Sequence, residues 1–356
     1  MLSWVLVDQV NAGFAMHPYP KDISEIWWSR AVARTTPQEA TGLYRKRFAL
    51  DADTRIATGG SCFAQHIARY LRSNGYNVID NEPAPFGLSD KAKLEFGYGI
   101  YSCRYGNIYH VRQLRQLLEE AIDGRPRDGI AWERKNRFYD ALRPGVEPEG
   151  LDSANDVKLH RERHLKRVRA MFEKTNVFVF TMGLTEAWVD AQTGVVFPSF
   201  PGSYTQFDPD IHVFKNFRVS EIYDDFVAFR SLLKIINPSV KFIVTVSPVP
   251  LMATATQSHV LPATTYSKSA LRAVASQLYD DFEDIDYFPS YEIISSPWSK
   301  GAFFAPDLRS VTDEGVATVM RAFFLEHRPT AQAEELPIAS LEEVVCEEVL
   351  LEAFSR

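Results

Sequence analysis

The chain has 356 residues, of which 46% are hydrophobic, and this is sufficient for one large folded domain or two small ones. Its formal net charge of -7 argues against a general nucleic-acid partner, because neutralising phosphates requires a basic face. A mainly disordered chain is excluded by the same composition.

Apolar runs alternate with helical stretches along the chain, and this alternation predicts a parallel sheet with helices on both faces. The apolar patch at the N-terminus lacks a basic region and is interrupted by Asp8, so no membrane span is expected. The helix expected after Tyr266 is assigned Ser267 as its N-cap, and Pro238 is expected to end the helix before it. Strands are predicted at 55–58, 76–80, 176–183, 240–250 and 285–294, and helices at 63–73, 111–122, 221–238, 266–282 and 313–327.

Three parts are predicted: an N-terminal extension (1–40) that packs on the core, a main domain (41–328) and an acidic tail (329–356). The main domain is expected to carry insertions near 123–155 and 193–217, because both are too long for ordinary connections. Their aromatic residues, such as Trp132 and Tyr204, are interpreted either as a sugar-stacking surface or as a local hydrophobic cluster.

The tail carries seven glutamates against one arginine. Ser340 and Glu343 form a capping-box pattern, which predicts a helix. This helix is expected to pack on the domain or on a second copy of the chain in a homo-oligomer, or else to stay solvated.

Polar residues follow several of the predicted strands, where ligands bind in an open parallel sheet. Ser61 follows the first strand, and Gly59 and Gly60 allow a sharp turn into a helix whose N-terminus offers N–H groups to an oxyanion. Thr185 and Glu186 follow a later strand. Cys62 is the alternative nucleophile, because a helix N-terminus lowers the pKa of a thiol.

A catalytic serine needs a base, and eight histidines are available. His259 lies in a polar loop directly after a strand end and is the candidate base, whereas His66 and His212 have structural interpretations. His160 and His164 have the i, i+4 spacing of a metal pair, but no third ligand accompanies them. No metal or other cofactor is therefore predicted.

Several segments have the form of family signatures: GSCFA at 60–64, RYGNIYHVRQLRQLL, VFTMGLTEAW, VSPVPLMATATQSHV and YFPSYEIISSPW. Together they resemble the GSCFA family, a bacterial group of SGNH-hydrolase-like domains. The resemblance implies an α/β fold of the SGNH or flavodoxin-like type, a three-layer α/β/α domain with a mainly parallel central sheet. The three cysteines are widely spaced and form no CxxC pair, which fits a reducing compartment. The protein is therefore expected to be cytoplasmic.

The resemblance also implies roles for individual residues. Ser61 takes the nucleophile position beside Gly60. Gly106 with Asn107 takes the glycine block that supplies an oxyanion N–H, with Gly97 and Gly99 as alternatives. Thr185 replaces the asparagine of the third block. The last block, normally Asp-x-x-His, begins here at Asp307 and has a serine in the histidine position.

The expected activity is that of a serine esterase or O-acyltransferase acting on acylated carbohydrate, in bacterial polysaccharide assembly. Ser61 would attack the ester, His259 would carry the proton with Asp307 or Glu186 orienting it, and the N–H groups of Ser61 and Gly106 would hold the oxyanion. The alternative is a catalytically inactive glycan-binding or assembly protein that retains the fold.

Overall fold

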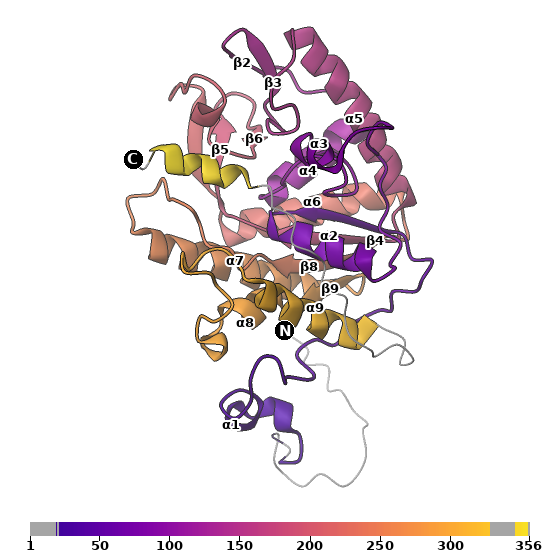
Figure 1. The fold of residues 1–356 in the computed structure, drawn as a ribbon, viewed down its shortest axis with the longest axis vertical. Coiled ribbons are helices and arrows are strands. Elements are labelled where there is room, and N and C mark those ends of the chain that lie inside the picture. Colours follow the sequence, from indigo (N-terminus) through magenta and orange to yellow (C-terminus); the bar gives the residue numbers. More distant parts are fainter. Residues whose placement is uncertain (1–18, 20, 328–345, 355–356) are drawn as a thin grey trace, which may run out of the picture.

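The computed structural model describes residues 19, 21–327 and 346–354. At its centre lies a sheet of four parallel strands in the order β1-β4-β8-β9 (Figure 1). The predicted parallel sheet is therefore confirmed. The strands are β1 (Ile56–Gly60), β4 (Val177–Met182), β8 (Lys241–Val246) and β9 (Ile285–Phe288).

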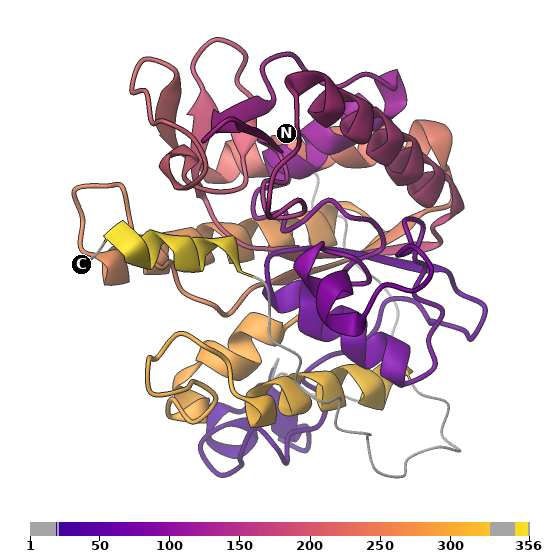
Figure 2. The same ribbon diagram turned by 45° about the horizontal axis from the view of Figure 1, so that its top comes forward.

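Helices cover both faces of this sheet and give the predicted three-layer α/β/α arrangement (Figures 1 and 2). Each face forms its own hydrophobic core with the helices that cover it. One face carries α4 (Val111–Asp123), α5 (Ala154–Lys174), α6 (Val219–Ile236) and α7 (Val260–Asp281), and the other carries α2 (Phe63–Ser73), α8 (Ser290–Ser295) and α9 (Asp313–His327).

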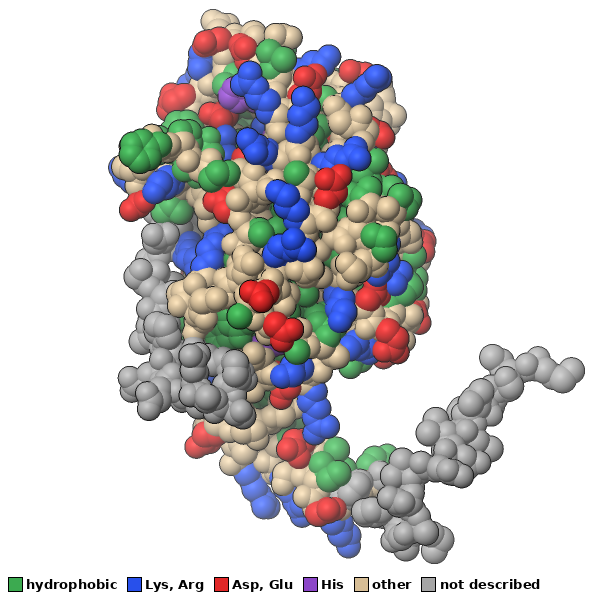
Figure 3. All heavy atoms as spheres, turned by 90° about the vertical axis from the view of Figure 1, so that its right-hand side faces the viewer, with side chains coloured by type: hydrophobic (Ala, Val, Ile, Leu, Met, Phe, Trp, Pro, Cys, Tyr) green, Lys and Arg blue, Asp and Glu red, His purple; other side chains and the backbone are tan. Residues whose placement is uncertain are grey.

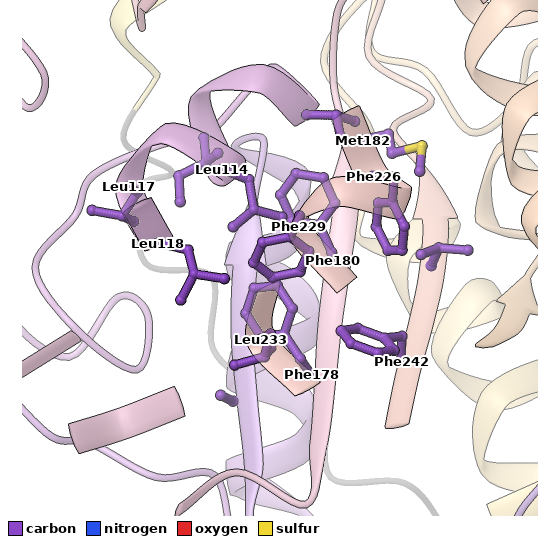
Figure 4. Close-up of a cluster of buried hydrophobic side chains, with 14 of the residues drawn as sticks. Leu114, Leu117, Leu118, Phe178, Phe180, Met182, Phe226, Phe229, Leu233 and Phe242 are labelled. Carbon is purple, nitrogen blue, oxygen red and sulfur yellow. The ribbon is translucent and has the colours of Figure 1, made fainter. Parts of the chain in front are cut away.

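The alternation of side chains along β4 explains why both faces are apolar. Phe178 and Phe180 point to the core under α4 and α6, whereas Val177 and Val179 belong to the opposite core (Figure 4). Successive residues of a strand face opposite sides, so a strand buried on both sides needs a continuous apolar run. This is the run that the sequence shows at 176–183.

The two insertions form small antiparallel structures that pack on each other. The first contains the hairpin of β2 (Ala131–Arg134) and β3 (Arg137–Asp140). The second belongs to a sheet ordered β6-β5-β7, with β5 (Glu186–Asp190), β6 (Val196–Phe197) and β7 (His212–Asn216). Trp132 is buried with its ring centroid 4.9 Å from that of Phe197, so it belongs to a local hydrophobic cluster.

Short helices complete the described chain, and none of the helices within it is long and apolar enough to cross a bilayer. The N-terminal segment contacts the domain through the indole of Trp298, which donates to the carbonyl of Thr35 at 2.8 Å. Basic and acidic side chains are interspersed on the face shown in Figure 3. The short helices are η1 (Ser24–Ile26), α1 (Trp28–Ala31), α3 (Asp90–Glu95), η2 (Pro201–Ser203), η3 (Pro297–Ser299) and η4 (Glu347–Phe354).

Three details of the predicted secondary structure are wrong. The strand expected at 285–294 ends at Phe288, and after Pro289 the chain forms the helix α8 instead. The strand expected at 76–80 is a single bridge between Val78 and Ile56, and Pro83 and Pro85 follow it without the N–H groups that a ladder needs. Helix α7 begins at Val260 rather than at Ser267, because a proline is tolerated in the first helical turn.

The acidic tail is described only in its last part. The capping-box residues Ser340 and Glu343 lie outside the described residues. From Glu347 to Phe354 the chain forms the 3-10 helix η4, which lies beside β5 and β6 (Figure 1, yellow). The predicted homo-oligomer stays a prediction.

Candidate functional site

The turn that places Ser61 depends on Gly60. Gly60 has a φ of +135°, and a Cβ built on it would lie 2.4 Å from the carbonyl oxygen of Thr181. Only glycine allows the two backbones to approach this closely. Ser61 then continues the pairing of β1 with β4, because its N–H donates to Thr181 O at 3.0 Å. Gly60 and this hydrogen bond therefore fix the backbone at the point where the chain leaves the sheet and enters α2.

Ser61 is enclosed, with 2% of its surface exposed. Its carbonyl oxygen accepts from Ala64 N at 2.8 Å and lies 3.0 Å from the Tyr101 hydroxyl oxygen, so its backbone is held in place. Its Oγ is buried and has no hydrogen-bond partner within the part of the chain that the structure describes. A Cβ added to Gly183 would lie 3.0 Å from Ser61 Cβ, so Gly183 packs directly on the serine.

The expected oxyanion role of the Ser61 N–H is wrong, because that N–H already bonds to the carbonyl of β4. Gly106 has a φ of +68°, and the neighbouring Asn107 is buried. The Asn107 Oδ1 accepts from the Tyr101 hydroxyl at 2.5 Å and from Gln65 Nε2 at 3.1 Å. Asn107 thereby ties this segment to α2, and the oxyanion roles of Gly106 and Asn107 stay predictions.

Thr185 and Glu186 lie beyond the end of β4, as expected. The Thr185 N–H donates to Ser267 Oγ at 3.1 Å, while its own hydroxyl is buried without a partner among the described residues. The Glu186 carboxylate accepts from Thr254 Oγ1 at 2.8 Å and from Ala255 N at 3.1 Å. Glu186 therefore holds the loop after β8.

His259 and Asp307 lie at exposed positions. His259 is the N-cap of α7, and its Nδ1 accepts from Leu261 N at 3.1 Å. Asp307 accepts from the backbone N–H groups of Arg309 and Ser310, each at 2.9 Å. No hydrogen bond among the described residues connects His259 with Ser61 or with Asp307. Their catalytic roles stay predictions.

Lys268 of α7 is a site residue that the sequence analysis missed. Its ammonium group is buried and donates to Gly183 O at 2.8 Å. Gly183 therefore contacts Lys268 on one side and Ser61 on the other. Burial lowers the pKa of Lys268 to about 8, although the negative charge of Glu348 acts in the opposite direction. The available signal was its spacing from Leu271 and Ala275, which puts a lysine on the buried face of the helix.

Two cysteines meet next to this lysine. The thiols of Cys62 and Cys346 are hydrogen-bonded, and Tyr109 Oη lies 3.7 Å from Cys346 Sγ. The hydrogen bond with Cys346, together with burial, raises the pKa of Cys62 well above its usual value. The same bond lowers the pKa of Cys346 to about 7, assisted by the positive charge of Arg309. The thiolate is thus favoured on Cys346 rather than on Cys62.

The last part of the tail lies across this region. Glu348 forms an ion pair with Arg309 at 2.9 Å. Beside it lies a cavity of about 480 Å³ lined by aromatic rings of the second insertion. Its lining includes Leu184, Glu186, Trp188, Phe200 and Phe214 from the domain and Glu348, Leu351 and Phe354 from the tail.

A larger cavity of about 700 Å³ lies between the N-terminal segment and α7, next to Trp28 and Arg272. None of the candidate residues lines it, so we place the site at the end of β1 and β4.

The two histidines with metal-pair spacing have separate partners. His164 Nδ1 lies 2.7 Å from a Glu82 oxygen, and His160 lies 3.8 Å from Glu147. Over residues 19–327 and 346–354, apart from residue 20, no group of three His, Cys, Asp or Glu side chains is placed to hold a metal.

The chain was compared with known proteins and families. Among solved structures it is similar to the "Crystal structure of a carbohydrate esterase family 3 from Talaromyces cellulolyticus", at 11% identity over 76% of this chain and 94% of that chain, with a TM-score of 0.26. A likeness at this TM-score carries no argument about the reaction. No curated protein matches the chain. The family model described as "GSCFA family" matches residues 55–323, which is most of the sequence, and the chain therefore belongs to the GSCFA family.

Proposed function

We propose that the protein is a serine-dependent carboxyl-ester hydrolase or acyltransferase with Ser61 as its nucleophile. The observation that carries this proposal is the Ser61 hydroxyl, which is buried at the carboxyl end of β1 without a hydrogen-bond partner among the described residues. Leaving a buried hydroxyl unpaired costs about 1–3 kcal/mol. Other buried hydroxyls, such as that of Thr58, are also unpaired among the described residues, so the position of Ser61 at the strand end is needed to single it out.

We assign the role of base to Lys268. Its amine donates to Gly183 O, and Ser61 Cβ packs on Gly183, but Lys268 Nζ and Ser61 Oγ are not hydrogen-bonded in this structure, so proton transfer requires the two side chains to move together. The lowered pKa of about 8 makes the neutral amine accessible near physiological pH. His259 precedes Lys268 by nine positions at the exposed start of the same helix, which corresponds to roughly 14 Å along the axis at ~1.5 Å per residue. This separation favours Lys268 over the base predicted from the sequence.

The reaction proceeds in two steps. Ser61 Oγ bonds to the carbonyl carbon of the ester while its proton passes to Lys268 Nζ, and the leaving alkoxide takes that proton as the C–O bond breaks. Water or an acceptor hydroxyl then attacks the acyl-serine, gives its proton to Lys268 and releases Ser61.

O-acylated carbohydrate, in bacterial polysaccharide assembly, is the proposed substrate class. The family resemblance suggests it, and the rings of Trp188 and Phe200 in the adjacent cavity offer apolar surface for an acyl chain or a sugar face. A second candidate, a glycan-binding protein without turnover, is favoured by the 2% exposure of Ser61 beneath the tail.

The proposal is tested by intact-mass spectrometry after treatment with a fluorophosphonate. We expect an adduct on the parent protein, no adduct on Ser61→Ala, and labelling slowed by about 10²–10⁴-fold in Lys268→Met. His259→Asn serves as the matched control, because asparagine preserves the N-cap acceptor while removing the imidazole. In the parent, the labelling rate should rise with pH through about 8, as Lys268 loses its proton.

Each alternative gives a different result. If His259→Asn loses the adduct while Lys268→Met keeps it, the base is His259. The labelling is repeated on Glu348→Ala, which lacks the ion pair between the tail and Arg309. If neither the folded parent nor folded Glu348→Ala forms an adduct, the glycan-binding alternative is favoured.

A further inference from the structure

We propose that Cys62 and Cys346 form a redox-active thiol pair, which a hydroperoxide converts to a disulfide that ties the C-terminal segment across the cavity lined by Trp188 and Phe200. This inference does not rest on the proposed reaction, because it depends only on the two thiols and on the contacts of the segment 346–354.

The two sulfurs are brought together from opposite ends of the chain. Cys62 is the N-cap of α2 and is buried, whereas Cys346 is partly exposed directly before η4. Both thiols are free, and they are hydrogen-bonded to each other. The proposed disulfide requires the two sulfurs to approach from this contact to a bond length of about 2.05 Å.

The two thiols have different surroundings and therefore different roles in the proposed oxidation. Arg309 and the Tyr109 hydroxyl stabilise a negative charge on Cys346, and its partial exposure gives a small oxidant access to the sulfur. Cys62 is enclosed and retains its proton. Cys346 is therefore the thiol that meets the peroxide, and Cys62 is the thiol that resolves the product.

The atoms and electrons balance in two steps. The Cys346 thiolate attacks one oxygen of hydrogen peroxide, so an S–O bond forms, the O–O bond breaks, and the departing hydroxide takes a proton to become water. Cys62 sulfur then attacks the sulfenic acid, and the hydroxyl leaves as water with the proton of Cys62. The two sulfurs each lose one electron, and the peroxide is reduced to two water molecules.

The disulfide would fix a segment that noncovalent contacts hold in the reduced protein. Glu348 pairs with Arg309, and the ring of Phe354 lies 5.5 Å from that of Phe200. Both tail residues line the 480 Å³ cavity. A covalent link immediately before them keeps the segment in place when the ion pair opens, and this limits access to the cavity.

The test uses the full chain, reduced, freed of reductant and titrated with hydrogen peroxide. We expect the intact protein to lose the mass of two hydrogen atoms, and peptide mapping without reductant to link the peptides of Cys62 and Cys346. Cys346→Ser and Cys62→Ser should form no link. Cys103→Ser is the matched control and should still form it, because Cys103 is buried against Tyr105 and other core residues away from the pair.

Hydrogen exchange over residues 346–354 measures the tethering. Exchange in this segment should slow on oxidation of the parent and of Cys103→Ser, and should not change in Cys346→Ser. Oxygen added to Cys346 without a link, or a link that involves Cys103, would overturn the proposed thiol pair. A Cys62–Cys346 link that leaves exchange unchanged would overturn the tethering.

Discussion

Replacing Gly60 with alanine is expected to destabilise the protein by about 4 kcal/mol, as the sum of overpacking (~1–3 kcal/mol) and a strained backbone (~1–3 kcal/mol). The new Cβ would lie 2.4 Å from Thr181 O and 2.6 Å from Thr181 N, which are backbone atoms inside the central sheet. An L-residue also disfavours the φ of +135°. Since native proteins are stable by only about 5–15 kcal/mol, a loss of this size leaves a marginal fold.

Urea unfolding of the parent, Gly60→Ala and Gly59→Ala measures this effect. Gly59 is the matched control, because its added Cβ would lie 3.3 Å from side-chain atoms of Phe178 and Tyr105 and its φ is not positive. Side chains can shift by a few tenths of an ångström, so Gly59→Ala should cost less than about 2 kcal/mol. Equal losses in the two variants would mean that the turn into Ser61 is not strained.

The core of the fold was predictable because its signal is local. A strand buried on both faces is apolar at nearly every position, and the runs that became β4 and β8 fulfil this condition apart from Thr181, Thr245 and the exposed Lys241 at the start of β8. The hairpin of β2 and β3 was not predicted, since its Trp132 is buried in a cluster with Val195 and Phe197 of the other insertion. The expected strand at 76–80 failed because only Val78 finds a partner.

Of the candidate site, the sequence predicted only the residues that directly follow strands. Ser61 and Thr185 lie at the ends of neighbouring strands, as an open parallel sheet requires. Lys268, Arg309 and Cys346 reach the same place from distant segments, and nothing in their local sequence indicates this convergence. Likewise, only the register of β1 against β4 shows that the Ser61 N–H is already bonded.

Lowering the pH from 6.5 to 5.0 is expected to reduce the free energy of unfolding by several kcal/mol. Burial is the main cause that lowers the pKa of four histidines, to about 4 for His66, His110 and His164 and to about 3 for His327. In the unfolded chain a histidine has a pKa of about 6.5. Between pH 6.5 and the folded-state pKa values, these histidines bind more protons in the unfolded state than in the folded state.

The sign and size follow from this difference. A depressed pKa in the folded state gives stability that is present above about pH 6.5 and is lost as the pH falls towards 4. Each histidine contributes roughly 1.5 kcal/mol between pH 6.5 and 5.0, so four contribute about 6 kcal/mol. The carboxyls of Asp225 and Asp286 act in the opposite direction, because burial raises their pKa and the folded state binds their protons more readily. The net loss is therefore smaller than the sum over the histidines.

Urea unfolding at a series of pH values separates the histidines from the other groups. His66→Leu should flatten the dependence by about a quarter of the histidine contribution. His66 suits this test because its buried ring packs on Phe63 and the positive charge beside it is that of Arg69, so leucine removes the titration without leaving a carboxylate unpaired. If His66→Leu unfolds with the same pH dependence as the parent, His66 binds protons equally in the folded and unfolded states, and its expected contribution is absent.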